Sequence, residues 1–275
     1  MSGASEVDTL KETLRMPQEQ LERLRDERDA LHHQLALRHR EIEQVRYDLQ
    51  QFAYAASHDL QEPLRLVSGF VQLLQSRYHG IIDDKADGYI DHITSAVGQM
   101  QKMLQGLTEF SRVETHGAPP VFTSLDEALD QALSHLGAEL QLSGAQIVRD
   151  TLPTIPADPA QMRQLFRHLI GNAIRFRGEM PLQIQVKVCR ETEFWIVSIA
   201  DNGIGIPVKF VERVFIVFQR LHPRGEYPGI GMGLAVCKRI VERHGGRIWV
   251  EPRLKPGTLV RFALPVSPEG MGRPP

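Results

Sequence analysis

Apolar residues recur through residues 10–56 at alternating spacings of three and four, and most positions of the repeat are apolar. A period of about 3.5 residues is typical of a coiled coil, so we predict one over residues 18–56. Pro17 should limit it, because proline disfavours a helix interior, and we expect residues 1–17 to be flexible. A single solvated helix is the alternative interpretation.

The helical pattern continues beyond this coil. It runs to Tyr78 with a bend expected at Pro63, and a second apolar stripe follows from Ile90 to Phe110. Two helices of one chain cannot enclose both stripes, whereas two chains could bury them as a four-helix bundle. We therefore predict a helical hairpin over residues 46–116 that makes the protein a homodimer.

Beyond residue 116 the pattern of apolar residues indicates both helices and strands. The stretch HGAPP indicates a linker, assigned to residues 117–121. A second domain over residues 122–266 is predicted to be an α/β sandwich of two layers, and the tail, residues 267–275, is expected to be disordered. Capping residues and apolar periodicity predict helices near 124–141, 159–177 and 234–244, and strands near 145–150, 183–188, 194–200, 247–252 and 258–264.

Composition narrows the classes of function. The chain has 275 residues, and its 32 basic and 34 acidic residues give a formal net charge of −2, which offers no electrostatic footprint for nucleic acid or an anionic membrane. No stretch approaches the ~20 apolar residues that cross a bilayer. Cys189 and Cys237 lack the spacing of a metal or redox site. We expect two buried free thiols in a cytoplasmic protein.

A glycine cluster, GIGMG, leads directly into a predicted helix. Its residues Gly229, Gly231 and Gly233 have no Cβ, so backbone amides at the positive helix end could approach phosphate oxygens closely. The cluster lacks the GK[ST] of a P-loop and does not open from a strand as the dinucleotide motif requires. The stretch before it is expected to be a mobile lid, anchored mainly by Phe215 and Phe218.

A second motif, DNGIGIP, closes a predicted apolar strand. It places Asp201 where a carboxylate can accept hydrogen bonds from the exocyclic amine of adenine. Gly203 and Gly205 would let the backbone turn beneath the base. On the preceding helix, Asn172 offers an amide oxygen suited to Mg²⁺, and Arg175, one turn away, could contact phosphate.

The predicted hairpin carries a third motif, SHDLQEPLR. His58 falls beside the heptad seam, so its ring should be reachable, and a neutral imidazole can attack phosphorus. Asp59 could accept or orient the other ring proton. A lone histidine on a helix surface is usually only solvated, so this interpretation depends on the downstream motifs.

The motifs SHDLQEPLR, HLIGNAIRFR, DNGIGIP and GIGMGLA follow one another over about residues 45–265. With the motifs in this order, the chain resembles the two-component sensor histidine kinases. Two of its segments, SHDLQEPLR and FQRLHPRGEYPGIGMGLAVCKRIVERHGGRIWVE, are similar to the subgroup attached to phytochromes. The resemblance implies an all-α dimerisation domain followed by a Bergerat-type ATP-binding domain, shared with gyrase and MutL-like ATPases. It implies ATP and Mg²⁺ as cofactors, phosphorylation of His58 with Asp59 as base, and transfer to an aspartate of a response-regulator receiver domain.

The resemblance also implies roles within the second domain, with Asn172 as the Mg²⁺ ligand and Asp201 as the residue that recognises adenine. The sequence departs from the family at two positions. His168 stands where the family commonly has the first Asn of its Asn box, and Glu62 stands where many relatives have Thr or Asn.

Two other functions stay open. A plain ATPase of the same fold would use ATP to drive a conformational cycle and would not need SHDLQEP on a dimer helix. A degenerate kinase would serve as a dimeric scaffold, although the intact Asn172, Asp201 and glycine motifs argue against it. The coil could connect to a sensor or bind a separate upstream sensory partner.

Overall fold

The computed structural model describes residues 3–223, 226–252 and 256–267; on the first helix the side chains of residues 3–22 and of several later positions, His58 among them, lie outside the description. The predicted disordered tail lies almost wholly outside the described residues. The chain forms two compact units, residues 1–52 and 53–275. None of the helices in the described part combines the length and apolar character that a membrane span requires.

Helix α1 extends from Gly3 to Tyr78. It passes through Pro17, after which the coiled coil is predicted to begin, and the start of the coil stays a prediction. Proline removes one backbone donor and strains one turn, but the hydrogen-bond ladder on either side can persist. In residues 23–48 the described large apolar side chains of the predicted seam are exposed in the single chain, for example Leu31 at 55% and Leu35 at 66%. The coiled coil stays a prediction that needs a second chain.

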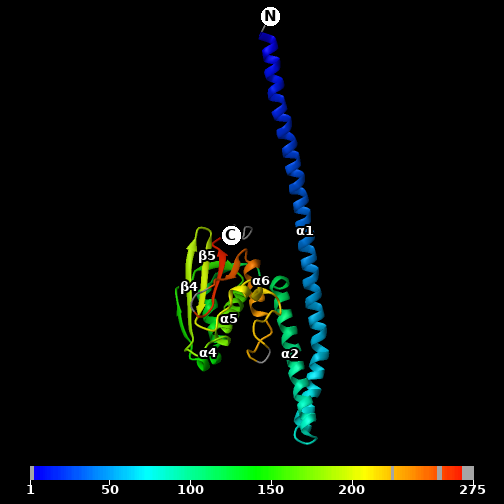
Figure 1. Cartoon of the computed structure of the whole chain (residues 1–275), viewed down its shortest axis with the longest axis vertical. Helices are drawn as coiled ribbons and strands as arrows, with labels where there is room; N and C mark the ends of the chain where they lie inside the picture. The colour runs from blue at the N-terminus through cyan, green and yellow to red at the C-terminus, as the bar shows by residue number, and fades with distance from the viewer. Residues whose placement is uncertain (1–2, 224–225, 253–255, 268–275) are drawn as a thin grey trace. The chain divides into compact units, whose positions relative to one another are not determined.

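Helix α2, Asp84–Thr115, forms a hairpin with the end of α1 (Figure 1). The Asp83 side chain caps α2 by accepting a hydrogen bond from the Ala86 N–H at 2.7 Å. A narrow apolar stripe of the hairpin is buried, comprising Leu64, Val71, Ile90 and Val97. A larger apolar set is exposed: Leu60, Leu66, Val67, Phe70, Leu73, Leu74, Ile93 and Met100. One chain therefore leaves much of the apolar surface of its hairpin uncovered.

The second half of the chain builds a five-stranded sheet with the order β2-β4-β5-β7-β6. All five predicted strands are confirmed: β2 Gln146–Arg149, β4 Gln183–Glu191, β5 Phe194–Asp201, β6 Arg247–Val250 and β7 Leu259–Pro265. Strands β2 and β4 pair in parallel, and the other neighbours pair antiparallel. Strand β5 lies in the middle, as its apolar character on both faces predicts.

Helices cover one face of this sheet (Figure 1). They are α3 Leu125–His135, α4 Gly137–Ser143, α5 Pro159–Arg175 and α6 Gly233–Arg243. The single helix predicted near 124–141 is two helices, because the chain breaks at Leu136 before Gly137, a residue with low helix propensity. A two-stranded sheet of β1, Val121–Ser124, and β3, Thr154–Ala157, is absent from the sequence prediction, since four residues are too few to show alternation.

Helix α5 begins at a strong cap and contributes much of the core. Asp158 caps it by accepting hydrogen bonds from the Ala160 and Gln161 N–H groups, and Pro159 occupies the first turn. Phe166 packs edge-on against Phe262 of β7, with ring centroids 6.0 Å apart. The buried stripe of α5 comprises Met162, Leu165, Phe166, Leu169, Ile170, Ala173 and Ile174. Burial of this stripe fixes the rotation of α5 about its axis.

The two cysteines differ in burial. Cys237 on α6 is buried in the core, and burial raises the pKa of its thiol. Cys189 in β4 is exposed, so the prediction of two buried thiols is wrong for this residue. Successive strand residues face opposite sides of a sheet, and Cys189 follows Val188, which packs against the core.

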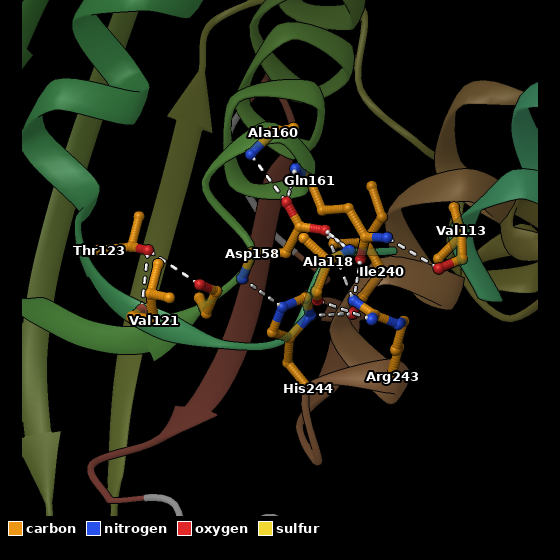
Figure 2. Close-up of polar contacts among 11 residues, drawn as sticks. Val113, Ala118, Val121, Thr123, Asp158, Ala160, Gln161, Ile240, Arg243 and His244 are labelled. Carbon is orange, nitrogen blue, oxygen red and sulfur yellow. Dashed lines mark hydrogen bonds and ion pairs between the residues drawn. The ribbon is translucent and has the colours of Figure 1, made fainter. Parts of the chain in front are cut away.

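The segment that joins the hairpin to the second domain is held by a polar cluster (Figure 2). Asp158 Oδ2 accepts a hydrogen bond from the Ala118 N–H at 2.7 Å, and Arg243 Nη2 donates to the Ala118 carbonyl at 2.9 Å. Gln161 Nε2 donates to the Val113 carbonyl at 2.8 Å. The end of α2 and the first residues of the predicted linker are therefore fixed to the sheet domain.

Candidate active site

A cavity of about 340 Å³ lies where α2 and α5 meet the end of β5 and the glycine-rich segment before α6. Its lining includes seven residues predicted to form the nucleotide site: Asn172, Arg175, Asp201, Gly205, Gly229, Gly231 and Gly233. Gly203 is buried in the turn that follows Asp201. The structure thus brings three separate sequence motifs to one place.

Asp201 ends β5 with its carboxylate held by the backbone. Its Oδ1 accepts hydrogen bonds from the Gly203 N–H at 2.8 Å and from the Thr258 N–H at 3.0 Å. The carboxylate is thereby oriented as part of the cavity lining, where it can accept a hydrogen bond from a ligand amine. Thr258 also lines the cavity, but no sequence motif marks it, because its role is to donate from the backbone.

One side of α5 faces the cavity with His168, Asn172 and Arg175, which follow the spacing of one helix face. Arg175 Nη1 donates a hydrogen bond to Asn172 Oδ1 at 3.4 Å. Desolvation lowers the pKa of Arg175 from its ordinary value, although an arginine keeps its charge at neutral pH. Helix α5 therefore presents a neutral oxygen ligand and a cation side by side to the cavity.

The donor set of the cavity fits Mg²⁺ bound together with a phosphate-bearing ligand. Within the described residues, no three or more His, Cys, Asp or Glu side chains cluster as a metal site. A cation beside Asn172 would take most of its oxygens from phosphates and water, which is the usual coordination of Mg²⁺ in such sites.

The glycine-rich segment 229–233 leads into the N-terminus of α6. Gly231 has a φ of +76°, and a Cβ at this position would collide with the Gln219 carbonyl, so only glycine fits. The N-cap residue is Met232, whose apolar side chain offers no acceptor to the first amides of α6. These amides and the positive end of the helix are suited to a phosphate group.

The predicted lid has more anchors than the sequence indicates. Phe215 packs against the core, as predicted. Tyr227 and His222 lie with their ring centroids 5.2 Å and 6.0 Å from that of Phe176, at the end of α5. Phe218 is 41% exposed and has a φ of +62°, a strained conformation for a bulky residue. The mobility of the lid stays a prediction.

Helix α2 also lines the cavity, which the sequence analysis does not predict. Lys102, Gln105, Gly106 and Glu109 all belong to the lining. Gly106 packs closely there, but a helix glycine alone does not mark the contact in the sequence, because Gly88 and Gly98 of α2 have no atom within 4 Å of an added Cβ.

Comparison with known families identifies two segments of the chain. Residues 48–116 match the His Kinase A (phospho-acceptor) domain, and residues 157–268 match the histidine kinase-, DNA gyrase B-, and HSP90-like ATPase family. The chain belongs to the sensor histidine kinases. The first matched segment of the chain contains His58, and the second contains Asn172 and Asp201.

The chain is similar to phytochromes of cyanobacteria. It is 42% identical over 234 residues to the phytochrome-like protein Cph1 of Synechocystis sp. (strain ATCC 27184 / PCC 6803 / Kazusa), covering 85% of this chain and 31% of that protein. It is 44% identical over 227 residues to cyanobacterial phytochrome A of Nostoc sp. (strain PCC 7120 / SAG 25.82 / UTEX 2576), covering 82% and 30%. The chain thus spans about a third of the length of these relatives.

Solved structures share the fold of this chain. Full-length ShkA in complex with AMPPNP matches with a TM-score of 0.58 at 22% identity, over 78% of this chain and 45% of that one. The histidine kinase ThkA in complex with the response regulator protein TrrA matches with a TM-score of 0.55 at 21% identity, over 80% and 62%. At these identities the likeness concerns the fold alone.

The described lining of the cavity includes no residue of the SHDLQEPLR motif. His58 and Asp59 lie on α1, and the side chain of His58 is outside the described residues. Asp59 is exposed, and within the described part of the chain α2 is the only hairpin helix that contributes to the cavity.

Proposed function

We propose that the chain binds ATP in the cavity beside α5, transfers the γ-phosphoryl group to His58, and passes it to an aspartate of a response-regulator receiver domain. The observation that carries the proposal is the convergence of Asp201, the Asn172–Arg175 pair and the N-terminus of α6 on one cavity. Together they supply an acceptor for the adenine amine, a cation ligand and a phosphate cradle.

Each of these groups has its own task. Asp201, oriented by two backbone amides, accepts from the exocyclic amine of adenine, and the turn with Gly203 and Gly205 lies next to it. The amides of the segment 229–233 and Arg175 hold phosphate oxygens. Asn172 contributes an oxygen to Mg²⁺, which neutralises phosphate charge when bound.

The chemical step belongs to the helical hairpin. A neutral imidazole nitrogen of His58 attacks the γ-phosphorus, the bond to the bridging oxygen breaks, and ADP leaves. Asp59 accepts or orients the proton on the other ring nitrogen. The product is a phosphoramidate, from which a receiver aspartate can take the phosphoryl group.

The proposed partners are inferred from the exposed apolar side chains of the hairpin and from related proteins. A second copy of the chain would cover the exposed apolar side chains of α1 and α2, which makes a homodimer the expected assembly. The complex of ThkA with a response regulator supports a receiver domain as the second partner. Because the matched relatives are about three times longer, residues 18–56 are proposed to connect to, or bind, a sensory partner.

Incubation with γ-labelled ATP and Mg²⁺ tests the proposal. The protein should acquire label that is stable in base and lost in acid. His58→Gln should abolish labelling but keep nucleotide binding, and Asn172→Ala or Asp201→Ala should abolish labelling through the loss of nucleotide contacts. Asp59→Asn should slow labelling by roughly 10²-fold or more if the carboxylate is a general base. His92→Gln, a change at an exposed histidine of α2, is the matched control and should label normally.

Three outcomes would contradict the proposal in different ways. Label retained by His58→Gln would show that the acceptor assignment is wrong. ATP hydrolysis without stable label would favour the plain ATPase, and failure of the wild type to bind nucleotide would favour the scaffold.

A further inference from the structure

Tyr54 lies on α1 one helical turn before His58, and its ring is in contact with the end of α2. The Arg112 guanidinium lies 5.6 Å from the centroid of the Tyr54 ring, and the centroid of the His116 ring lies 5.2 Å from the same point. Both distances are within the range of cation–π and aromatic contacts. We call Tyr54, Arg112 and His116 the tyrosine clasp.

The imidazole of the tyrosine clasp is held by its neighbour on α2. The Thr115 hydroxyl donates to the Ser111 carbonyl at 3.1 Å, so its oxygen can accept a hydrogen bond from the His116 Nδ1–H, 2.7 Å away. His116 is also the C-cap residue of α2, and its backbone N–H donates to the Arg112 carbonyl at 3.0 Å. Arg112 and His116 therefore belong to one helical turn that is fixed by its own hydrogen bonds.

Two further residues lie on the same face of α1 as Tyr54. Ser57 is fully buried, and its hydroxyl donates to the Ala53 carbonyl at 2.6 Å. Gln61 Nε2 donates to Thr108 Oγ1 of α2 at 3.4 Å. Residues 54, 57 and 61 follow the spacing of one helix face. This face contacts α2 on either side of residue 58, and it fixes the rotation of α1 about its axis there.

Small rotations of α1 matter for the reaction. Phosphoryl transfer needs the attacking nitrogen roughly in line with the phosphorus and the leaving oxygen. A side-chain atom about 6 Å from a helix axis moves by about 1 Å when the helix turns by about 10°. A misplacement of about 1 Å can slow an enzyme reaction about 10²-fold. A contact that fixes the rotation of α1 beside His58 therefore acts on the transfer step.

The tyrosine clasp depends on an aromatic ring and contributes little to the core. Arg112 and His116 are exposed, and Tyr54 is half-buried, so the contact covers little apolar surface. The face of an aromatic ring attracts a guanidinium, whereas leucine has no such attraction. Arg112 lies over the ring of Tyr54, so a phenylalanine at this position keeps the contact.

We propose that Tyr54 is a positioning residue for the phosphorylation of His58. The tyrosine clasp holds the rotation of α1 against the end of α2 and thereby aligns the acceptor helix for transfer from ATP. The inference rests on the proposed function, since it concerns the rate of that transfer. Tyr54 is not among the described residues that line the nucleotide cavity, so its effect falls on transfer and not on ATP binding.

Tyr54→Leu tests this role in the full chain, with the initial rate of labelling measured at several concentrations of γ-labelled ATP with Mg²⁺. The maximal rate should fall about 10-fold or more, while the ATP concentration that gives half of it should change less than about 2-fold. Tyr54→Phe keeps the ring and should label within about 2-fold of the wild type. Tyr89→Leu, which changes an exposed tyrosine of the same hairpin, is the matched control and should label normally.

A double-mutant cycle separates the tyrosine clasp from a general loss of packing. Arg112→Leu should also slow labelling, and the double variant with Tyr54→Leu should be no slower than the slower single variant, because both changes break one contact. Circular dichroism should show the helix content of the wild type in each variant. If Tyr54→Leu does not fold, His116→Ala takes its place, because it removes an exposed ring at the end of α2 and should slow labelling without changing the ATP dependence.

The outcomes separate the positioning role from the proposed function. A wild-type maximal rate in Tyr54→Leu, a Tyr54→Phe variant as slow as Tyr54→Leu, or additive effects in the cycle would overturn the positioning role alone. If the wild type acquires no label, the proposed function fails and the positioning role fails with it.

Discussion

Replacement of Asp158 by alanine should destabilise the ATP-binding domain more than any surface ion-pair change. This carboxylate is 3% exposed and serves two structures at once (Figure 2). Its Oδ1 accepts from the Ala160 and Gln161 N–H groups at the start of α5, and its Oδ2 accepts from the Ala118 N–H and faces Arg243 Nη1 at 3.7 Å.

The expected loss can be estimated from these contacts. Loss of an N-cap costs about 0.5–2 kcal/mol. Loss of the charged oxygen that accepts the hydrogen bond from the Ala118 N–H costs about 1.5–3 kcal/mol. Arg243 keeps some solvent contact, at 20% side-chain exposure, so its lost partner adds less than in a fully buried pair. Because one carboxylate makes all these contacts, the total should be about 3–5 kcal/mol rather than their full sum.

Urea unfolding followed by tryptophan fluorescence measures this loss in the right domain, because both tryptophans of the chain, Trp195 and Trp249, lie in the sheet. Asp158→Asn should cost about half as much, since its single oxygen can cap α5 or accept from Ala118, but not both. Asp130→Ala, which removes a surface ion pair with Arg149, is the control and should cost at most about 1 kcal/mol. A loss below about 1 kcal/mol for Asp158→Ala, or equal losses for the alanine and asparagine variants, would refute the reasoning.

Two further predictions concern the site and its pH dependence. Gly231→Ala should weaken AMPPNP binding at least about 10-fold, because the residue has a φ of +76° and an added Cβ would meet the Gln219 carbonyl. The control is Gly137→Ala, where an added Cβ meets open space, and this variant should bind AMPPNP normally in the same titration. Burial lowers the pKa of His244 below its ordinary value of 6.5, so below pH 6.5 the unfolded chain takes up a proton that the folded chain does not. Acidification below pH 6.5 should therefore lower the free energy of unfolding by up to about 1.4 kcal/mol per pH unit. Urea unfolding at several pH values should show a smaller slope for His244→Gln, and an unchanged slope would contradict this assignment. The lowered pKa of Glu109 acts in a lower window, since its stabilisation is present above 4.5 and is lost as the pH falls below that value.

The parts of the fold that could be predicted from the sequence are those with a local cause. Helix α5 has a capping aspartate, a proline in its first turn and a regular apolar stripe, and the structure matches the predicted start. Strand β5 is apolar on both faces and ends at Asp201, so both its central place and its site residue could be inferred. The glycine-rich segment likewise indicates a close backbone approach, which the collision at Gly231 explains.

The parts that could not be predicted depend on distant partners. Asp158 can be identified as a cap from sequence, but its contacts with Ala118, Arg243 and His244 join segments far apart in the chain. The His244 imidazole accepts a hydrogen bond from the Asp158 N–H at 3.0 Å, a role that no sequence pattern reveals. Strands β1 and β3 are similarly defined by their mutual pairing rather than by their own residues.

On the α2 side of the cavity, a residue that is unfavourable within its own helix is explained by its contact with another part of the protein. Judged from α2 alone, Gly106 weakens a helix, and judged from α5 alone, His168 is a departure from the Asn that the family commonly has. In the structure the glycine lets α2 reach Ile230 and Met232, and the imidazole lies opposite Glu109. Gly106 and His168 are thus explained together by the packing of α2 against the cavity, a contact between segments that lie far apart in the chain.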